Sequence, residues 1–459
     1  MEMRVKTYRE RLGHVLKLSI PAILAQISSI IMQYIDAAMA GSLGAEATAA
    51  IGLVASTTWL FGGLCMAAAA GFSVQTAQLI GAGEQEGARR VLRQGLLCTF
   101  LFGLALAAVG ISISSFLPLW LGGEGDTARN SSRYFFIYAC ALPAVQLRHL
   151  AGNMLQCSGD MRTPSRLNIL MCFLDVFFNS LLIFPARQLL ISGFAIPIPG
   201  VGLGVAGAAL GTAVSELITA FLMLYAVCFR SKSLRLEPHG SWRPEGKCLK
   251  ISFRLGLPIA LEHTILCGAQ IMGTRIVAPL GTVAVAANSL GVTAESLCYM
   301  PGYGIGAAAT TLVGQSIGAG EEKLAKDYAR LCVLFGMAVM TCTGGLMFLG
   351  APWMFSLLTP DPAIRLLGTR VLRIEAFAEP MFAASIVAAG ALRGAGDTLI
   401  PSILNLASMW GVRITLSLLL APRLGLAGVW LAMCVELCVR GVLFLIRLFR
   451  GKWLTGRLV

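Results

Sequence analysis

Twelve apolar segments, each of a length that can cross a membrane as a helix, divide this chain of 459 residues. A hydrocarbon core of about 30 Å needs about 20 helical residues. The segments lie at approximately 15–40, 48–80, 94–118, 134–156, 165–186, 201–229, 251–277, 284–317, 330–357, 371–392, 400–421 and 425–448. The sequence therefore predicts an all-α polytopic membrane protein with twelve transmembrane helices.

Charged residues are scarce and unevenly placed. They make up 13% of the chain, whereas soluble domains carry about 25%. The net charge of +13 comes without any nucleic-acid-binding motif, so we expect no nucleic-acid partner. With the N-terminus in the cytoplasm, about 25 of the 36 Lys and Arg residues lie in cytoplasmic connectors. The positive-inside rule therefore predicts a multi-pass protein of the inner cell membrane with both termini cytoplasmic.

The sequence gives no sign of an enzyme or a resident metal. Thirteen cysteines are scattered through mostly apolar segments without a C-x-x-C pair, as expected of small buried side chains. The four histidines are dispersed, and we find no nucleophile constellation and no Walker A sequence. We therefore expect no catalytic residues, cofactor or bound metal. The basic N-terminus precedes an apolar run too long for a signal peptide, so we interpret that run as a retained first span.

The two halves of the chain repeat each other. The matching pairs, all 237 positions apart, are Pro21 and Pro258, Gly44 and Gly281, Gln78 and Gln315, Pro143 and Pro380, Asp160 and Asp397, and Asn168 and Asn405. Late in each half the offset changes to 221, where Leu203-Gly-x-Ala-Gly matches Leu424-Gly-x-Ala-Gly. Six spans per half make the repeats parallel. We predict lobes at 1–229 and 251–459, joined by a cytoplasmic linker at 230–250.

The repeated Gly-Ala-Gly-Glu and Gly-Asp-x-x-x-Pro sequences fall in short connectors. Glycine supplies left-handed turn conformations, and aspartate caps helices. We interpret both motifs as turn and capping signals rather than as ligand sites.

Asp36 and Pro21 set the first span apart. A carboxylate inside a membrane span is costly unless it becomes neutral, pairs or meets water, so such residues are functional candidates. Pro21 removes a backbone donor and can bend the helix near its start. A helix that can bend and that carries a titratable acid suggests a protein whose conformational changes are driven by ions.

At this point the motifs resemble a known family over almost the whole chain. They are Pro21…Asp36-x-x-x-Ala-Gly-x-Leu-Gly44, Gly81-Ala-Gly-Glu-Gln-Glu-Gly-Ala-Arg-Arg90, Leu155-Gln-Cys-Ser-Gly-Asp160-x-x-x-Pro164, Asp175-x-x-x-Asn179, Leu312-Val-Gly-Gln-x-Ile-Gly-Ala-Gly320 and Leu392-Arg-Gly-Ala-Gly-Asp-Thr398. Together they are similar to the multidrug and toxic compound extrusion (MATE) transporters. The resemblance implies a V-shaped pair of lobes and an antiporter that exports small organic, often cationic compounds in exchange for protons or sodium ions.

The resemblance also implies a cation-coupling site in the first lobe, built from Asp36, Asp175, Asn179 and Thr212. Asp175 and Asn179 are one turn apart on the fifth span and share a face. Family members commonly place Asn first, so the carboxylate here is moved by about 6 Å along the helix. Because two carboxylates in an apolar pocket cannot both stay charged alone, we expect them to hold one proton or one transient Na⁺. Pro21 lies where the first helix of the family is thought to bend.

The second lobe has no acid at the position equivalent to Asp36, where Gly273 stands. It carries Glu262, Glu295 and Glu379, with Glu375 one turn before the last of these. We consider Glu262, Glu295 and Glu379 as possible ion or substrate residues. The alternative is that Glu295 and Glu379 form structural ion pairs, for which the candidate partners are Arg148, Arg275 and Arg413.

Two function classes remain besides an antiporter. A lipid-linked precursor flippase of the same superfamily is the alternative, but it predicts extra spans or a basic cavity for a pyrophosphate. A membrane enzyme would need a catalytic cluster. The expected partners are small organic substrates and the lipid bilayer, with the protein acting as a monomer.

Overall fold

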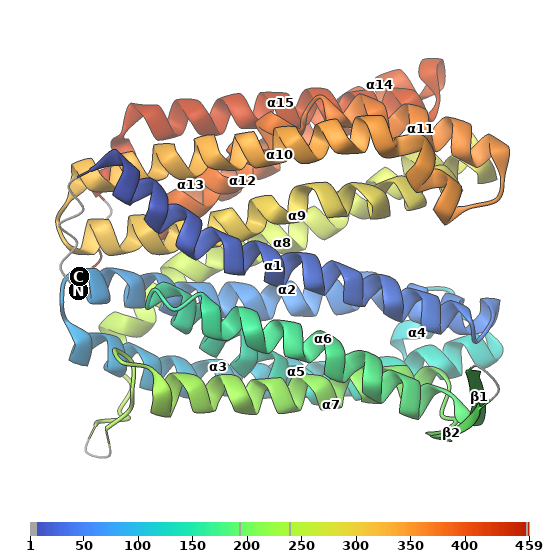
Figure 1. Ribbon diagram of the computed structural model, residues 1–459, viewed down its shortest axis with the longest axis horizontal. Helices are drawn as coiled ribbons and strands as arrows, with labels where there is room; N and C mark the ends of the chain where they lie inside the picture. The colour runs from blue at the N-terminus through green and yellow to red at the C-terminus, as the bar shows by residue number, and fades with distance from the viewer. Residues whose placement is uncertain (1–6, 192–193, 238–239, 456–457, 459) are drawn as a thin grey trace.

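The computed structural model describes residues 7–191, 194–237, 240–455 and 458. Within them the chain is almost entirely helical (Figure 1). The first half contains α1 (Tyr8–Gly41), α2 (Ala45–Gly81), α3 (Gln85–Ile113), α4 (Leu117–Trp120), α5 (Gly125–Cys157), α6 (Arg162–Ile183), β1 (Pro185–Ile191), β2 (Phe194–Val201), α7 (Val205–Tyr225) and η1 (Ala226–Arg230). The second half contains α8 (Gly246–Val277), η2 (Ala278–Leu280), α9 (Thr282–Gly318), α10 (Glu322–Leu358), α11 (Pro362–Ala376), α12 (Glu379–Gly394), α13 (Leu399–Ser408), η3 (Met409–Ile414), α14 (Thr415–Leu424), α15 (Leu426–Arg450) and η4 (Lys452–Thr455).

The twelve expected spans correspond to these elements. Nine described helices are long and apolar enough to cross a membrane. The other three expected spans are α5 and α9, which are long enough but are not among these nine, and the tenth span. The tenth span is divided into α11 and α12 at Phe377 and Ala378. The eleventh is one continuous run of α13, η3 and α14, with a π-helical middle.

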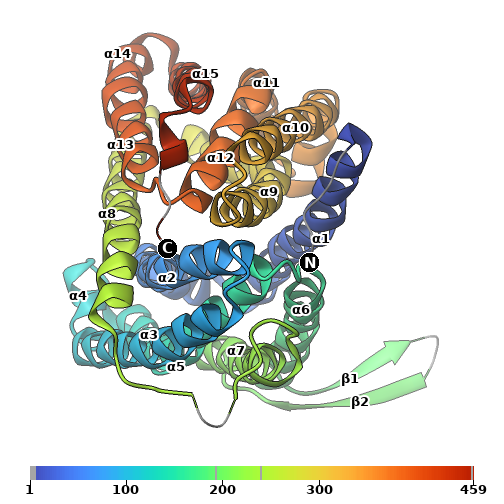
Figure 2. The ribbon, with the colours of Figure 1, turned by 90° about the vertical axis from the view of Figure 1, so that its left-hand side faces the viewer.

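Each half exchanges its first helix with the other half. Helix α1 packs against α6 of its own half and against α9 of the second half. Helix α8 packs against α2 of the first half and against α13 of its own half. Figure 2 shows α1 and α8 on opposite flanks of the boundary between the two lobes. The two lobes are therefore connected by helix packing as well as by the linker.

Both ends of the described chain lie at one end of the bundle, and the β1–β2 hairpin lies at the other (Figure 1). We call these ends the termini side and the hairpin side. The antiparallel hairpin pairs Pro185 with Val201 and Ile191 with Phe194. It falls where the repeat offset changes from 237 to 221, a difference of 16 positions. The hairpin is therefore an insertion that only the first half carries.

Equivalent glycines have equivalent backbone conformations in the two halves. The φ angles are 107° and 100° for Gly44 and Gly281, 81° and 75° for Gly83 and Gly320, 90° and 88° for Gly159 and Gly396, and 58° and 60° for Gly204 and Gly425. All lie in the left-handed region that favours glycine. The duplicated sequence thus encodes a duplicated backbone, including the part after the change of offset.

Of the capping signals predicted from the repeated motifs, that of Asp160 is confirmed. Asp160 accepts hydrogen bonds from the backbone N–H groups of Arg162 and Thr163, both at 3.1 Å. Its equivalent, Asp397, instead accepts from the guanidinium of Arg447 at 2.7 Å. The two copies share the turn but not the side-chain partners.

The lobes meet closely at the termini side. Helices α2 and α9 end there at Gly81 and Gly318, and a methyl group on either glycine would overlap the backbone of Gln315 or Gln78, respectively. In contrast, at the hairpin side, nothing lies within 4 Å of a Cβ built on Gly41, Gly44, Gly52, Gly273 or Gly281. The close backbone approach of α2 and α9 at Gly81 and Gly318 therefore lies at the termini side.

Two equivalent glutamines reinforce this contact. Gln315 Nε2 donates to the carbonyl of Cys157, the last residue of α5, at 2.8 Å. Gln78 Nε2 donates to the carbonyl of Gly394, the last residue of α12, at 3.3 Å. The donors are repeat equivalents, and so are the acceptors. We call this pair of hydrogen bonds and the two glycines beside it the glutamine latch.

Candidate cation site in the first lobe

Two helices bring two carboxyl groups together around one amide. Asn179 Nδ2 donates to Asp36 Oδ1 at 3.0 Å and to Asp175 Oδ2 at 2.9 Å. These two oxygens are therefore at most about 6 Å apart. Asp36 comes from α1, whereas Asp175 and Asn179 lie one turn apart on α6. The helical spacing expected from the sequence is what lets a single amide serve both acids.

The site contains more acceptors than donors. Asp175 has no exposed surface and Asn179 is 1% exposed. Asp175 Oδ1 and Asn179 Oδ1 are buried without a hydrogen-bond partner. Thr212 of α7 lies beside Asp175, and the phenol of Tyr134 lies within electrostatic range of both acids. Unpartnered buried oxygens are costly, and a proton or a small cation would relieve that cost.

Close helix packing holds Asn179 in place. A side chain at Gly211 of α7 would collide with the Asn179 amide oxygen and backbone. Glycine at 211 therefore lets α7 approach α6 at the level of the site. The same approach brings Thr212, the next residue, to the acids.

The second lobe has no copy of this arrangement. The positions equivalent to the two acids and the amide are Gly273, Val412 and Leu416. Within the described residues, no group of three or more His, Cys, Asp or Glu residues is arranged to hold a metal ion. The arrangement of two acids around one amide is therefore not repeated in the second lobe.

Glu262 of α8 lies in a different kind of environment. Its carboxylate accepts hydrogen bonds from Ser402 and Asn405, both at 2.6 Å, and from Arg393 at 3.1 and 3.2 Å. Both side-chain oxygens are thus supplied with donors. This geometry is typical of an acid that holds α8 to α12 and α13.

Glu375 and Glu379 flank the break between α11 and α12. Neither has any exposed surface, and none of their four carboxyl oxygens has a hydrogen-bond partner. The two carboxyl groups interact with each other, and Glu295 of α9 lies within electrostatic range of both. In the described chain neither Glu295 nor Glu379 forms an ion pair with an arginine. Arg148, one of the expected partners, is paired with Glu216 instead.

Comparison with known proteins agrees with this architecture. The MatE family model matches residues 21–181 and 258–419, once in each half. The chain belongs to the MatE family. Members are membrane transporters without enzymatic activity, and the resemblance inferred from the motifs is therefore confirmed.

Relatives of this MatE protein match nearly its whole length. A probable multidrug resistance protein NorM from Idiomarina loihiensis is 30% identical over 445 residues, covering 95% of this chain and 93% of the relative. A probable multidrug resistance protein NorM from Thermotoga maritima is 26% identical, covering 95% and 92%. A solved structure described as the outward-facing conformation of a multidrug resistance MATE family transporter has a TM-score of 0.88 at 19% identity, with 97% of each chain covered. That likeness confirms the twelve-helix, two-lobe fold.

Most residues of the candidate cation site in this MatE protein could be predicted from the sequence, but their contacts could not. Asp36, Asp175, Asn179 and Thr212 are brought together, and their role in coupling stays a prediction. Tyr134 beside them was missed, because a tyrosine in an apolar helix carries no distinguishing pattern. Pro21 lies within an uninterrupted α1, where Gly304 of α9 packs against the α1 backbone at Ala22 and Ile23.

The contacts of Glu262 lead to a prediction about stability. Glu262→Ala would leave the Arg393 guanidinium without its carboxylate, and we expect a loss of about 3 kcal/mol. Thermal unfolding of the purified protein would show a lower Tm, whereas the exposed Glu322→Ala should change it little. A Glu262→Ala protein with an unchanged Tm but no transport would contradict the structural role and favour a coupling role.

Proposed function

We propose that this MatE protein exports small organic compounds, drug-like and cationic or amphipathic, in exchange for H⁺ or Na⁺. The names of its relatives support the substrate class, since they are multidrug resistance proteins. The proposal of ion coupling rests on the cluster of Asp36, Asp175 and Asn179, in which one amide donates hydrogen bonds to two carboxyl groups. The protein works without a cofactor, as a monomer.

The proposed orientation follows the charge pattern of the connectors. Both termini lie in the cytoplasm of the inner cell membrane, so the termini side is the cytoplasmic side. The glutamine latch then closes the cytoplasmic end of the boundary between the lobes. In this proposal the structure corresponds to a state that is closed toward the cytoplasm.

The cation site is connected to the other lobe through α1. Tyr34, two residues before Asp36, donates its hydroxyl to the carbonyl of Thr293 on α9 at 2.5 Å. A cation between Asp36 and Asp175 neutralises the pair, and its departure leaves buried charge that α1 can relieve by moving. Because α1 also packs on α9, such movement changes the packing between the lobes. Cation and substrate thus favour different arrangements of one structure, which is the thermodynamic basis of exchange.

Each acid has a distinct part in this proposal. Asp36 and Asp175 hold the cation, with Asn179 and Thr212 supplying further oxygens, and Pro21 allows α1 to bend. Glu295 and Glu379, with Glu375, form a second buried acid group that binds substrate or a further ion. We give Glu262 a structural part, which is supported by its four hydrogen bonds from three side chains.

The test is transport by the purified protein in lipid vesicles. We expect a fluorescent organic cation to move against its gradient when either a proton gradient or a sodium gradient is imposed, and to stay when neither is present. The gradient that drives transport identifies the coupling ion. Transport that depends on neither gradient would contradict the proposed antiport. Movement of a fluorescent lipid-linked precursor in place of every organic cation would favour a flippase.

A further inference from the structure

A basic pocket on the termini side is not explained by transport. It has a volume of about 600 Å³ and lies where α7 and η1 end and the linker to α8 begins. The residues that line it are Arg89, Phe229, Arg230, Ser231, Lys232, Arg235, Leu236 and Glu237. Four of these eight side chains are cationic and one is acidic, so the pocket is suited to an anion.

The linker that carries the pocket is folded against η1 rather than extended. The backbone N–H of Ser231 donates to Ala226 O and that of Leu236 to Cys228 O, both at 2.9 Å. The N–H of Leu234 donates to Ser231 Oγ at 3.2 Å, and the Leu234 side chain has no exposed surface. These bonds therefore hold the linker backbone that carries the basic residues against η1.

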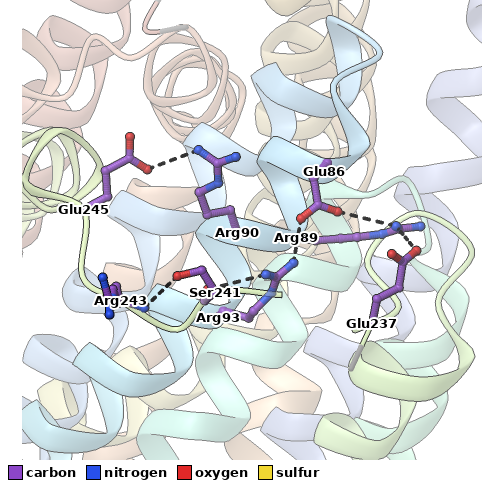
Figure 3. A network of polar contacts seen from close by, with 8 residues as sticks. All are labelled: Glu86, Arg89, Arg90, Arg93, Glu237, Ser241, Arg243 and Glu245. Carbon is purple, nitrogen blue, oxygen red and sulfur yellow. Dashed lines mark hydrogen bonds and ion pairs between the residues drawn. The ribbon is translucent and has the colours of Figure 1, made fainter. Parts of the chain in front are cut away.

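The acids of this region are already occupied by other arginines (Figure 3). The pairs are Arg89 with Glu86 and Glu237, Arg93 with Glu86, and Arg90 with Glu245. Arg93 also donates to the Ser241 carbonyl at 3.4 Å, which ties the linker to the start of α3. These pairs leave the three linker cations without a neutralising acid.

Those three cations are Arg230, Lys232 and Arg235. All are exposed, and none forms an ion pair with any residue in the described part of the chain. Three cations that line one pocket without a counter-charge repel one another. An oxyanion with several acceptor oxygens, such as a phosphate, would relieve that repulsion.

An aromatic stripe leads along the helix to the same pocket. Phe221, Tyr225 and Phe229 are spaced four residues apart on one helical face, and they are 70%, 49% and 64% exposed. The rings of Tyr225 and Phe229 lie 5.6 Å apart, and Phe229 itself lines the pocket. Exposed tyrosines such as Tyr225 mark the level of lipid headgroups in a membrane helix, and the two phenylalanines add apolar surface beside it. The pocket thus has a basic wall beside an apolar approach from the bilayer.

We propose that this pocket binds the phosphate of an anionic phospholipid, with the acyl chains lying along Phe221, Tyr225 and Phe229. Bound there, the lipid phosphate holds the linker between the two lobes to the end of α7. A free phosphate ion would satisfy the cations alone, but it would leave the aromatic approach unused. The proposal depends on the protein's place in a membrane and not on which ion or substrate it transports.

The test is a lipid titration of the delipidated full-length protein in detergent, followed by native mass spectrometry. We expect phosphatidylglycerol to bind at least about tenfold more tightly than phosphatidylcholine. In the triple variant Arg230→Gln, Lys232→Gln, Arg235→Gln, phosphatidylglycerol binding should weaken about a hundredfold. Arg235→Gln alone should give a smaller loss in the same direction, which serves as a milder variant if the triple one folds poorly.

The matched control is Lys247→Gln, Lys250→Gln, Arg254→Gln. These residues are exposed at the start of α8, carry the same total charge and do not line the pocket. We expect the control to change the affinity by less than about threefold. Equal losses in the two triple variants, or no preference for phosphatidylglycerol, would overturn the site. Displacement of the lipid by an equal concentration of inorganic phosphate would overturn the assignment to a lipid.

Discussion

Replacing Asp36 by Asn is expected to reduce ion-driven transport by at least about a hundredfold while leaving the protein folded. Asn has nearly the same shape as Asp but cannot carry the charge that attracts a cation. Breaking a buried charge interaction costs about 3 kcal/mol or more, which corresponds to this factor. The measurement is uptake of a fluorescent organic cation in vesicles under whichever gradient drives the unmodified protein.

The design offers a matched control and an internal test. Asp126→Asn makes the same chemical change at an exposed residue paired with Arg129, and it should leave transport unaltered. Asp175→Asn should be as severe as Asp36→Asn, and the double variant should be no worse, because the two acids act as one unit. Gradient-driven transport that survives Asp36→Asn would refute the first-lobe site and direct attention to Glu375 and Glu379.

Replacing Gly81 by Ala is expected to abolish transport by a different route. The new methyl group would overlap the Gln315 backbone, so α2 and α9 could no longer meet at the termini side. The closed arrangement would be destabilised by about 1–3 kcal/mol, and the protein would favour arrangements open at this side. Gly318→Ala should act in the same way on the equivalent contact with Gln78.

The quantity to measure is the distance between the ends of α2 and α9 at the termini side. Spin labels at the repeat-equivalent positions Gln85 and Glu322 should report a longer distance in Gly81→Ala than in the parent protein. Gly345→Ala in α10 is the control, because nothing lies within 4 Å of a Cβ at that position. A Gly81→Ala protein with the parent distance and normal transport would show that the glutamine latch does not need close contact.

The sequence predicted what depends on pattern. The span lengths, the duplication and the turn glycines follow from local hydrophobicity and from a repeated backbone requirement, so Gly44 and Gly281 could be matched before their φ angles were known. Asp175 and Asn179 could be placed on one face because a helix has a fixed period. The acid on α1 was selected because a charge inside a span is costly.

What depends on helix neighbours could not be predicted in this way. Glu262 and Arg393 are 131 positions apart, and nothing in either segment indicates that they pair. The latch glutamines belong to a repeated motif that we interpreted only as a turn signal, yet their side chains cross to the opposite half. The change of repeat offset marks an insertion in the first half but not its hairpin structure, and the break at Phe377 lies in a segment where the offset does not change.

The exchange of first helices has a consequence for how the protein is made. Helix α1 is complete at Gly41, but its partner α9 does not begin until Thr282, about 240 residues later. At a synthesis rate of about 5–20 residues per second, α1 waits on the order of ten seconds or more for that partner. Asn179 of α6 arrives earlier and can cover Asp36 first. A nascent chain halted before α9 therefore leaves one face of α1 open to lipid or to a neighbouring protein.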